Sequence, residues 1–204
     1  MNAGAPGPAA HAHPRRTVPA MNALRFAIFD TETTGFSPGH VLQVAVVIAR
    51  GDGTIEDSWS TYVARRFWRP GRLGAYHVHG ITRRALRGGI SMREALDAFE
   101  QRCAGAIPVA HNAAFDLTFL RAEATRLNRP LHIDPVLCSL TLSRSLDPKR
   151  TRSHKLVDLA RHYGVTQLPT HDALDDSHTT AAVLTRLLRE ARIDSVDALA
   201  PYRV

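Results

Sequence analysis

Two carboxylates, Asp30 and Glu32, follow directly on an apolar run near the start of the chain. The run, residues 24–29, is mostly apolar and predicts a buried strand. Residues two apart on a strand point to the same face, so we expect the two carboxylates to lie side by side. Unpaired, they would repel each other and be costly to desolvate. A divalent cation removes both penalties, and hard oxygen ligands of this kind suit Mg²⁺ or Mn²⁺ rather than zinc.

The order of apolar segments predicts an α/β fold, in which a mixed five-stranded sheet is flanked by helices. Asp52 and Gly53 predict the turn of a hairpin between the second and third strands. The strands are expected at residues 24–29, 41–49, 55–63, 107–110 and 133–137. Five helices are expected. They lie at residues 91–104, directly after Asn112, in a short segment that ends at Leu142, at residues 153–163 and at residues 173–191. Residues 65–89 show little periodicity and predict a loop, either one that faces a substrate or an ordinary surface loop.

Composition favours one folded domain with a polyanionic partner. The chain has 204 residues, of which 44% are hydrophobic, enough for a sizeable core. Its formal net charge is +7, and the excess comes from arginine, since Lys149 and Lys155 are the only lysines. A GC-rich genome explains the arginine bias equally well, so charge alone establishes no nucleic-acid binding. Residues 1–22 are rich in Ala, Gly, Pro and His, and we expect a disordered extension there, followed by one domain at 23–204.

Cysteine content and hydropathy predict a cytoplasmic protein. Cys103 and Cys138 are the only cysteines, too few and too far apart to suggest a disulfide scaffold or a zinc site. No apolar stretch approaches the roughly 20 residues needed to cross a bilayer. The first residues lack the apolar centre of a signal peptide. We therefore expect no membrane association.

Two further motifs carry candidate metal ligands. Asp116 ends the segment His-Asn-Ala-Ala-Phe-Asp, at the first turn of an expected helix, and His171 and Asp176 lie in His-Asp-Ala-Leu-Asp-Asp-Ser. Each has a plain structural explanation when taken singly, because acids are stabilised at helix starts and the chain contains 11 histidines. Taken together, in this order and context, the motifs predict a site for phosphodiester cleavage with two metal ions.

These motifs resemble those of the DEDDh branch of the 3′-to-5′ exonucleases, which includes the proofreading epsilon subunit of bacterial replicative polymerase. The resemblance extends from about Leu24 to Leu188 and includes the segment His79-Gly80-Ile81-Thr82. It implies an RNase H-like fold for the sheet and helices expected above. The domain at 23–204 is accordingly expected to be a 3′-to-5′ exonuclease domain.

The resemblance also implies the roles of individual residues. Two divalent cations, Mg²⁺ or Mn²⁺, would be held by Asp30, Glu32, Asp116 and Asp176. His171 would be the general base, and imidazole is well matched to proton transfer near neutral pH. The pocket for the terminal nucleotide is expected to include Thr33, His79, His111, Asn112 and Phe115. Asp175 misses the family spacing by one residue and should face elsewhere, and Asp172 stands where the family usually has arginine.

The predicted activity is hydrolysis of single-stranded DNA from the 3′ end to nucleoside 5′-monophosphates, in repair or in proofreading like that of the DNA polymerase III epsilon subunit. An exoribonuclease that trims RNA or oligoribonucleotides is the alternative, since the motifs do not determine how the pocket treats a 2′-hydroxyl. A silent nucleic-acid-binding module is disfavoured by the intact set of five groups. The chain contains no polymerase region and ends at Val204, which favours a free-standing nuclease over one docked to a polymerase.

Candidate phosphate contacts lie in and beside the expected loop. Phosphates of a single strand are guided by basic side chains while bases pack on apolar ones. A solvated basic face is an equally good interpretation of these arginines. They are Arg65, Arg66, Arg69, Arg72, Arg83, Arg84 and Arg87.

Overall fold

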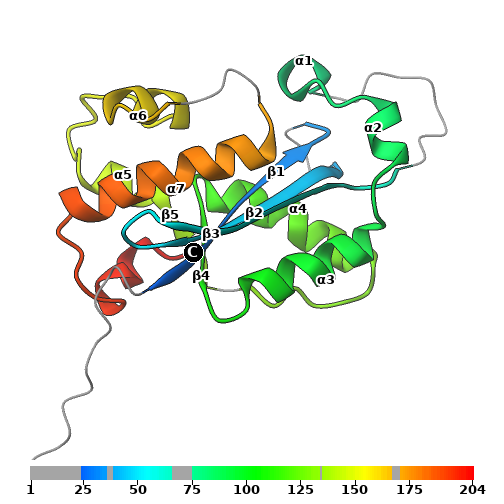
Figure 1. Cartoon of the computed structure of the whole chain (residues 1–204), viewed down its shortest axis with the longest axis horizontal. Helices are drawn as coiled ribbons and strands as arrows, with labels where there is room; N and C mark the ends of the chain where they lie inside the picture. The colour runs from blue at the N-terminus through cyan, green and yellow to red at the C-terminus, as the bar shows by residue number, and fades with distance from the viewer. Residues whose placement is uncertain (1–23, 36–38, 66–74, 134, 167–170) are drawn as a thin grey trace, which may run out of the picture.

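The computed structural model describes residues 24–35, 39–65, 75–133, 135–166 and 171–204, so the extension expected at 1–22 lies outside the described residues. Its centre is a five-stranded sheet in the order β3-β2-β1-β4-β5 (Figure 1). The strands are β1 (Arg25–Thr33), β2 (Val41–Arg50), β3 (Ile55–Tyr62), β4 (Ile107–Ala110) and β5 (Leu137–Cys138). The β1-β2 and β2-β3 pairs are antiparallel, whereas β1-β4 and β4-β5 are parallel. The expected mixed five-stranded sheet is thus confirmed.

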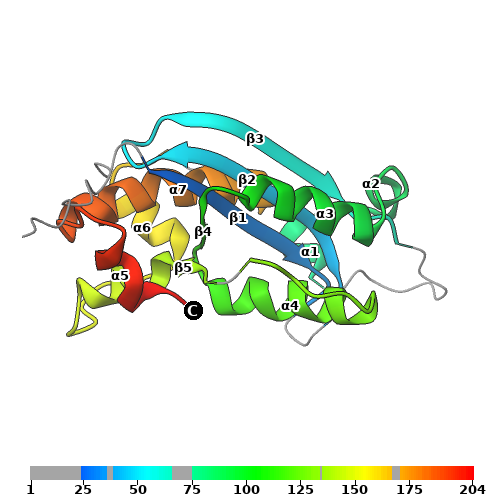
Figure 2. The ribbon, with the colours of Figure 1, turned by 90° about the horizontal axis from the view of Figure 1, so that it is seen from below.

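Helices cover both faces of this sheet. Figures 1 and 2 show α7 on one side with α5 and α6, and α3 and α4 on the other. The long helices are α3 (Met92–Cys103), α4 (Ala113–Arg126) and α7 (Ala173–Glu190). The short ones are α1 (Tyr76–His79), α2 (Arg83–Arg87), α5 (Ser139–Ser145) and α6 (Leu156–His162), with a 3-10 helix at Asp197–Tyr202. No helix in the described ranges is both long and apolar enough to cross a membrane.

The alternation along β1 determines which face receives each side chain. Phe26 and Ile28 are buried against the side chains of α5, α6 and α7. Ala27 and Phe29 are buried against those of α3 and α4. The even-numbered positions of β1 therefore face α7. β2, whose apolar residues are buried on both faces of the sheet, pairs with the edge of β1 opposite to β4.

Local signals account for the starts of two long helices, α3 and α7. Ser91 and Glu94 form the predicted capping box at the start of α3, with each side chain accepting a hydrogen bond from the other's backbone N–H. Asp172 begins α7 by accepting from the backbone N–H groups of Leu174 and Asp175.

Three expected segments differ in the structure. The loop expected at 65–89 contains α1 and α2, and residues 66–74 lie outside the described part of the chain; α2 begins where the Thr82 hydroxyl accepts from Ala85 N at 3.2 Å. β5 is shorter than expected, because Pro135 has no N–H to donate to a ladder. α6 begins at Leu156 rather than at residue 153, since Asp147 organises the preceding residues as a loop.

Candidate active site

The two carboxylates of β1 lie on the face of the sheet that α7 covers. Asp30 and Glu32 continue the series of Phe26 and Ile28, so they point toward α7 rather than toward α4. The strand does not end before them, as the sequence suggested, but runs on to Thr33. They are therefore held rigidly by the ladder between β1 and β2.

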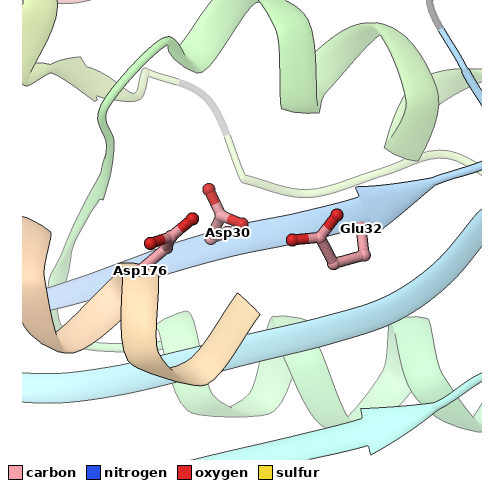
Figure 3. A group of neighbouring side chains, drawn as sticks. All are labelled: Asp30, Glu32 and Asp176. Carbon is pink, nitrogen blue, oxygen red and sulfur yellow. The ribbon is translucent and has the colours of Figure 1, made fainter. Parts of the chain in front are cut away.

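Asp176 reaches the same place from the first turn of α7. Figure 3 shows its carboxylate beside those of Asp30 and Glu32. One oxygen from each of the three side chains can be chosen so that all lie within 4.8 Å of one another. Asp175 is not a member of this group, as its spacing predicted. Three carboxylates from two elements thus converge on one point.

His171 lies at the rim of this group. Its Nδ1 is 3.9 Å from Asp176 Oδ2, and 61% of its side chain is exposed. An exposed imidazole at the edge of an acidic centre can exchange protons with solvent. This position is compatible with the predicted role of a general base.

Asp116 joins the site from the opposite face of the sheet. It is only 3% exposed, on the first turn of α4. Its Oδ1 accepts two hydrogen bonds from Thr31, one from the backbone N at 3.1 Å and one from the hydroxyl at 2.7 Å. Thr31 faces away from Asp30 and Glu32, and Asp116 is not among the three carboxylates whose oxygens lie within 4.8 Å, yet its charge acts on Asp30.

Burial and mutual repulsion disfavour ionisation of the acids. Burial first, and then the charges of Asp116, Asp176, Glu32 and Asp172, hold the pKa of Asp30 well above its usual range. Burial, followed by the charges of Asp176, Asp172 and Asp116, raises the pKa of Glu32 to about 8. Burial also raises the pKa of Asp116 to about 7, although its hydrogen bonds oppose the shift.

The donor set therefore fits a hard divalent cation. Carboxylate oxygens are the ligands that Mg²⁺ and Mn²⁺ prefer, and a bound cation would relieve the repulsion that raises these pKa values. The shift of several neighbouring acids in the same direction is a property of functional sites more often than of structural ion pairs.

Gln43 and Thr31 make contacts that were not predicted from the sequence. Gln43 is 3% exposed, faces Glu32 across the β1-β2 ladder, and donates from Nε2 to Asp172 Oδ2 at 2.9 Å. Its Oε1 accepts from the backbone N of Ala173 at 3.4 Å. The signal for Gln43 was a polar residue inside the apolar run 41–49, whereas the role of Thr31 depends on how α4 packs.

Three residues predicted for the nucleotide pocket lie near the carboxyl end of β1 or on α1 and α4. The Thr33 hydroxyl is buried and donates to Gly35 O at 3.1 Å. The ring of His79 is buried, and its Nδ1 accepts from Ile81 N at 2.9 Å. Phe115 is half-buried, with its ring centroid 5.0 Å from that of Phe119.

His111 and Asn112 lie on the other side of the site, where they line a pocket together with His171. Both ring nitrogens of His111 are engaged inside the protein, Nδ1 with Ser139 Oγ and Nε2 with His154 O, each at 3.0 Å. Burial, ahead of the charge of Arg144, lowers the pKa of His111 to about 4. This neutral ring connects the first residue of α5 to the loop before α6, and it positions Asn112 and the start of α4.

Of the arginines predicted to guide phosphates, Arg65 is engaged elsewhere. Its guanidinium binds the buried carboxylate of Glu123, which also accepts from His40 Nδ1 and Val41 N, each at 3.1 Å. The predicted guiding residues at 66, 69 and 72 lie outside the described residues. The other three, Arg83, Arg84 and Arg87, are on α2.

Comparisons with known proteins agree with this geometry. The model of the RNase_T family, described as exonuclease, matches residues 27–184. The DNA polymerase III PolC-type of Clostridium perfringens is 32% identical over 161 residues, which are 78% of this chain but 11% of that protein. The chain thus spans about a ninth of the length of this relative.

Two solved structures share the fold. Exonuclease X in complex with 5′ overhanging duplex DNA aligns with a TM-score of 0.67 and 26% identity, over 88% of this chain and 98% of that one. The zinc ion bound form of the E. coli ExoI-ssDNA complex aligns with a TM-score of 0.69 and 19% identity, over 81% of this chain and 40% of that one.

Proposed function

The chain belongs to the RNase_T exonuclease family and is a 3′-to-5′ exonuclease, and on this premise we propose that it hydrolyses the 3′ ends of single-stranded DNA to nucleoside 5′-monophosphates. The observation that carries the proposal is the convergence of Asp30, Glu32 and Asp176 within 4.8 Å beside His171. The exonuclease domain is proposed to comprise residues 23–204.

The family depends on divalent metal, and we propose two ions, Mg²⁺ or Mn²⁺, as the cofactors of this protein. Asp30, Glu32, Asp116 and Asp176 are the residues that would hold them. When bound, such ions lower the pKa of water and stabilise the oxygen that leaves from the phosphodiester. Oxygen-only ligands favour Mg²⁺ and Mn²⁺ over softer metals.

The protein's own groups have separate roles in this proposal. His171 takes the proton from the attacking water, for which its exposure at the rim of the site is suited. The acids would hold the metal, which would supply the positive charge that orients the scissile phosphate. Thr33, His79 and Phe115 border the terminal nucleotide, and the neutral ring of His111 holds Asn112 in place.

We favour DNA over RNA as the substrate on the basis of three of the proteins that the chain resembles, although another aligned structure, 16% identical, is a 3′-exonuclease that recognises a histone mRNA stem-loop. One is a DNA polymerase, and the two solved structures contain a DNA overhang and single-stranded DNA. We propose a repair or proofreading role similar to that of the epsilon subunit of DNA polymerase III, in the cytoplasm. Two free, buried cysteines are compatible with a reducing compartment.

Matched 5′-labelled DNA and RNA strands test the proposal. Each strand is incubated with Mg²⁺, with Mn²⁺ or with chelator, beside an Asp30→Ala control. Metal-dependent shortening from the 3′ end, faster on DNA, is expected. Faster shortening of RNA would move the role to RNA turnover. Cleavage of neither strand by folded protein in the presence of metal would contradict the exonuclease proposal and favour a silent binding module.

A further inference from the structure

A second pocket lies next to His171 and outside the group of acids. It has a volume of about 920 Å³, within the size range of small-ligand sites. α5, the loop from α5 to α6, and the start of α6 form its walls, and Asn112 and His171 border it on the side of the active site. None of the described residues that line it is acidic. Its cations are Arg144, Arg150 and Lys155.

The three cations are exposed and form no ion pair with a carboxylate within the described residues. Many other arginines of the chain are paired, as Arg129 is with Asp97 and Glu100. Pairing reduces the attraction that a cation exerts on a phosphate. Arg144 and Arg150 retain that attraction, and Lys155, whose charge helps to lower the pKa of Asp158, retains part of it. The pocket is therefore a concave, positively charged surface beside an acidic centre.

The charges of these arginines affect the pKa values of two neighbouring histidines, His154 and His111. Burial is the main reason why the pKa of His154 is lowered, and the charges of Arg150, Arg152 and Arg144 lower it further, against the opposing effect of Asp147. Arg144 acts in the same direction on the pKa of His111. Arg144 and Arg150 therefore lie close enough together to act on the same buried ring.

The loop that carries Arg150 is built around one buried carboxylate. Asp147 is 8% exposed, and its oxygens accept from Thr151 Oγ1 at 2.9 Å and from Arg152 N at 3.0 Å. Within this turn Arg150 has a φ of 54°, a conformation that costs a non-glycine residue about 1 kcal/mol or more. A turn fixed in this way presents the Arg150 side chain in a defined direction.

The location of the pocket indicates which part of a substrate it meets. The residues proposed to border the terminal nucleotide include Thr33 at the carboxyl end of β1 and His79 on α1. Figure 1 shows α1 beyond the first turn of α7, whereas α6 lies alongside the body of that helix. A strand whose last nucleotide lies near α1 and whose terminal phosphodiester lies at the acids would continue past His171 and Asn112 toward α6.

We propose that this pocket, through Arg144, Arg150 and Lys155, binds the backbone phosphates on the 5′ side of the bond that is cleaved. The inference rests on the proposed function, since it assigns the pocket to the same substrate. Charged contacts to phosphate carry no base specificity, which suits an enzyme that must accept any sequence. Long strands then bind more tightly than substrates with a single phosphate.

The test compares two triple variants that remove the same charge. One variant is Arg144→Gln, Arg150→Gln and Lys155→Gln. The control is Arg186→Gln, Arg189→Gln and Arg192→Gln, the first two at the end of α7 far from the acids and the third just beyond it. Binding of a labelled oligodeoxynucleotide is measured by fluorescence anisotropy in chelator, so that no turnover is required. Hydrolysis of the p-nitrophenyl ester of thymidine 5′-monophosphate, which has no upstream phosphate, is measured with metal.

We expect the pocket variant to raise the Kd for the oligodeoxynucleotide at least about tenfold, because each charged hydrogen bond to phosphate contributes strongly. The slope of log Kd against log salt should fall by about 0.7 for each phosphate that the variant no longer neutralises. Hydrolysis of the ester should keep its kcat/KM. Arg150→Gly, which removes the charge and fits the left-handed backbone, should weaken binding without loss of thermal stability.

An unchanged Kd in the pocket variant would overturn the inference, as would an equal rise in the control variant or an equal loss on the ester. A wild-type protein that binds DNA through this pocket but hydrolyses neither substrate would contradict the proposed function. The same result would still support the phosphate-binding site.

Discussion

Gln43 on β2 is hydrogen-bonded to Asp172 at the start of α7, with its Nε2 2.9 Å from Asp172 Oδ2. The same amide accepts from Ala173 N at 3.4 Å. Gln43 is the ladder neighbour of Glu32, and Asp172 directly follows His171. One buried side chain of β2 thus connects the ladder partner of β1, the strand that carries Asp30 and Glu32, to the helix that carries Asp176.

Replacing Gln43 with Met should weaken the site without unfolding the protein. The change removes two hydrogen bonds and leaves Asp172 with one partner fewer, at a cost of about 1–3 kcal/mol in the free energy of unfolding. Metal affinity and kcat should fall about 10- to 100-fold, as for other residues that orient metal ligands. Urea unfolding and metal titration check this. Asp172→Asn, which keeps the helix cap, is the control and should lose less stability. Wild-type metal affinity in Gln43→Met would contradict the positioning role.

Metal-free protein should lose stability as the pH rises. The folded pKa of Glu32 is about 8 and that of Asp116 about 7, both above the ordinary carboxyl range. The folded state therefore binds more protons than the unfolded state between about pH 4 and about pH 8, so the free energy of unfolding falls across that window. Urea unfolding in chelator at several pH values measures the slope. Asp30→Asn should flatten it, and a free energy of unfolding that rises with pH would contradict the acidic cluster.

Replacing His171 with Gln should separate chemistry from metal binding. The loss of a general base lowers kcat by about 10²- to 10⁴-fold. His171 contributes no ligand to the group formed by Asp30, Glu32 and Asp176, so the rise in melting temperature on adding Mg²⁺ should remain. Steady-state kinetics and thermal melts in parallel check both parts. A kcat close to that of the wild type would exclude His171 as the base.

Glu123 should be essential for stability rather than for catalysis. Its carboxylate is 2% exposed and neutralises Arg65, of which only 18% is exposed. Replacing Glu123 with Ala leaves a buried guanidinium without its partner, at a cost of about 3–5 kcal/mol. Replacing its exposed partner Arg126 with Gln should cost less than about 1 kcal/mol. Urea unfolding compares the two, and equal losses would contradict this ranking.

The sequence predicts the architecture well because the long elements carry strong local signals. The apolar runs of β1 and β2, the capping box of α3 and the start of α7 at Ala173 are all confirmed. The short elements are less predictable: α1 and α2 lie in a segment without periodicity, and β5 consists of two residues. Such elements depend on the packing of the whole domain rather than on local sequence.

For the site, the resemblance to the DEDDh family implies Asp176 rather than Asp175, and the structure brings Asp176 to Asp30 and Glu32. Spacing does not reveal the contacts that hold these groups. Thr31 binds Asp116 across 85 positions of sequence, and Gln43 binds Asp172 across 129. Interactions over such sequence separations are set by the sheet and by helix packing. The ion pair between Arg65 and Glu123 could not be predicted from the sequence for the same reason.

Two neighbouring aspartates of α7 offer the most direct test of the central claim, that convergent carboxylates bind metal for hydrolysis of a 3′ end. Release of the 3′-terminal nucleotide from single-stranded DNA in Mg²⁺ is measured for wild type, Asp176→Asn and Asp175→Asn. Because Asp176 belongs to the converging group and Asp175 does not, Asp176→Asn should lose at least about 100-fold in rate and Asp175→Asn should stay close to wild type. Retention of activity in Asp176→Asn, or an equal loss in both variants, would contradict the account.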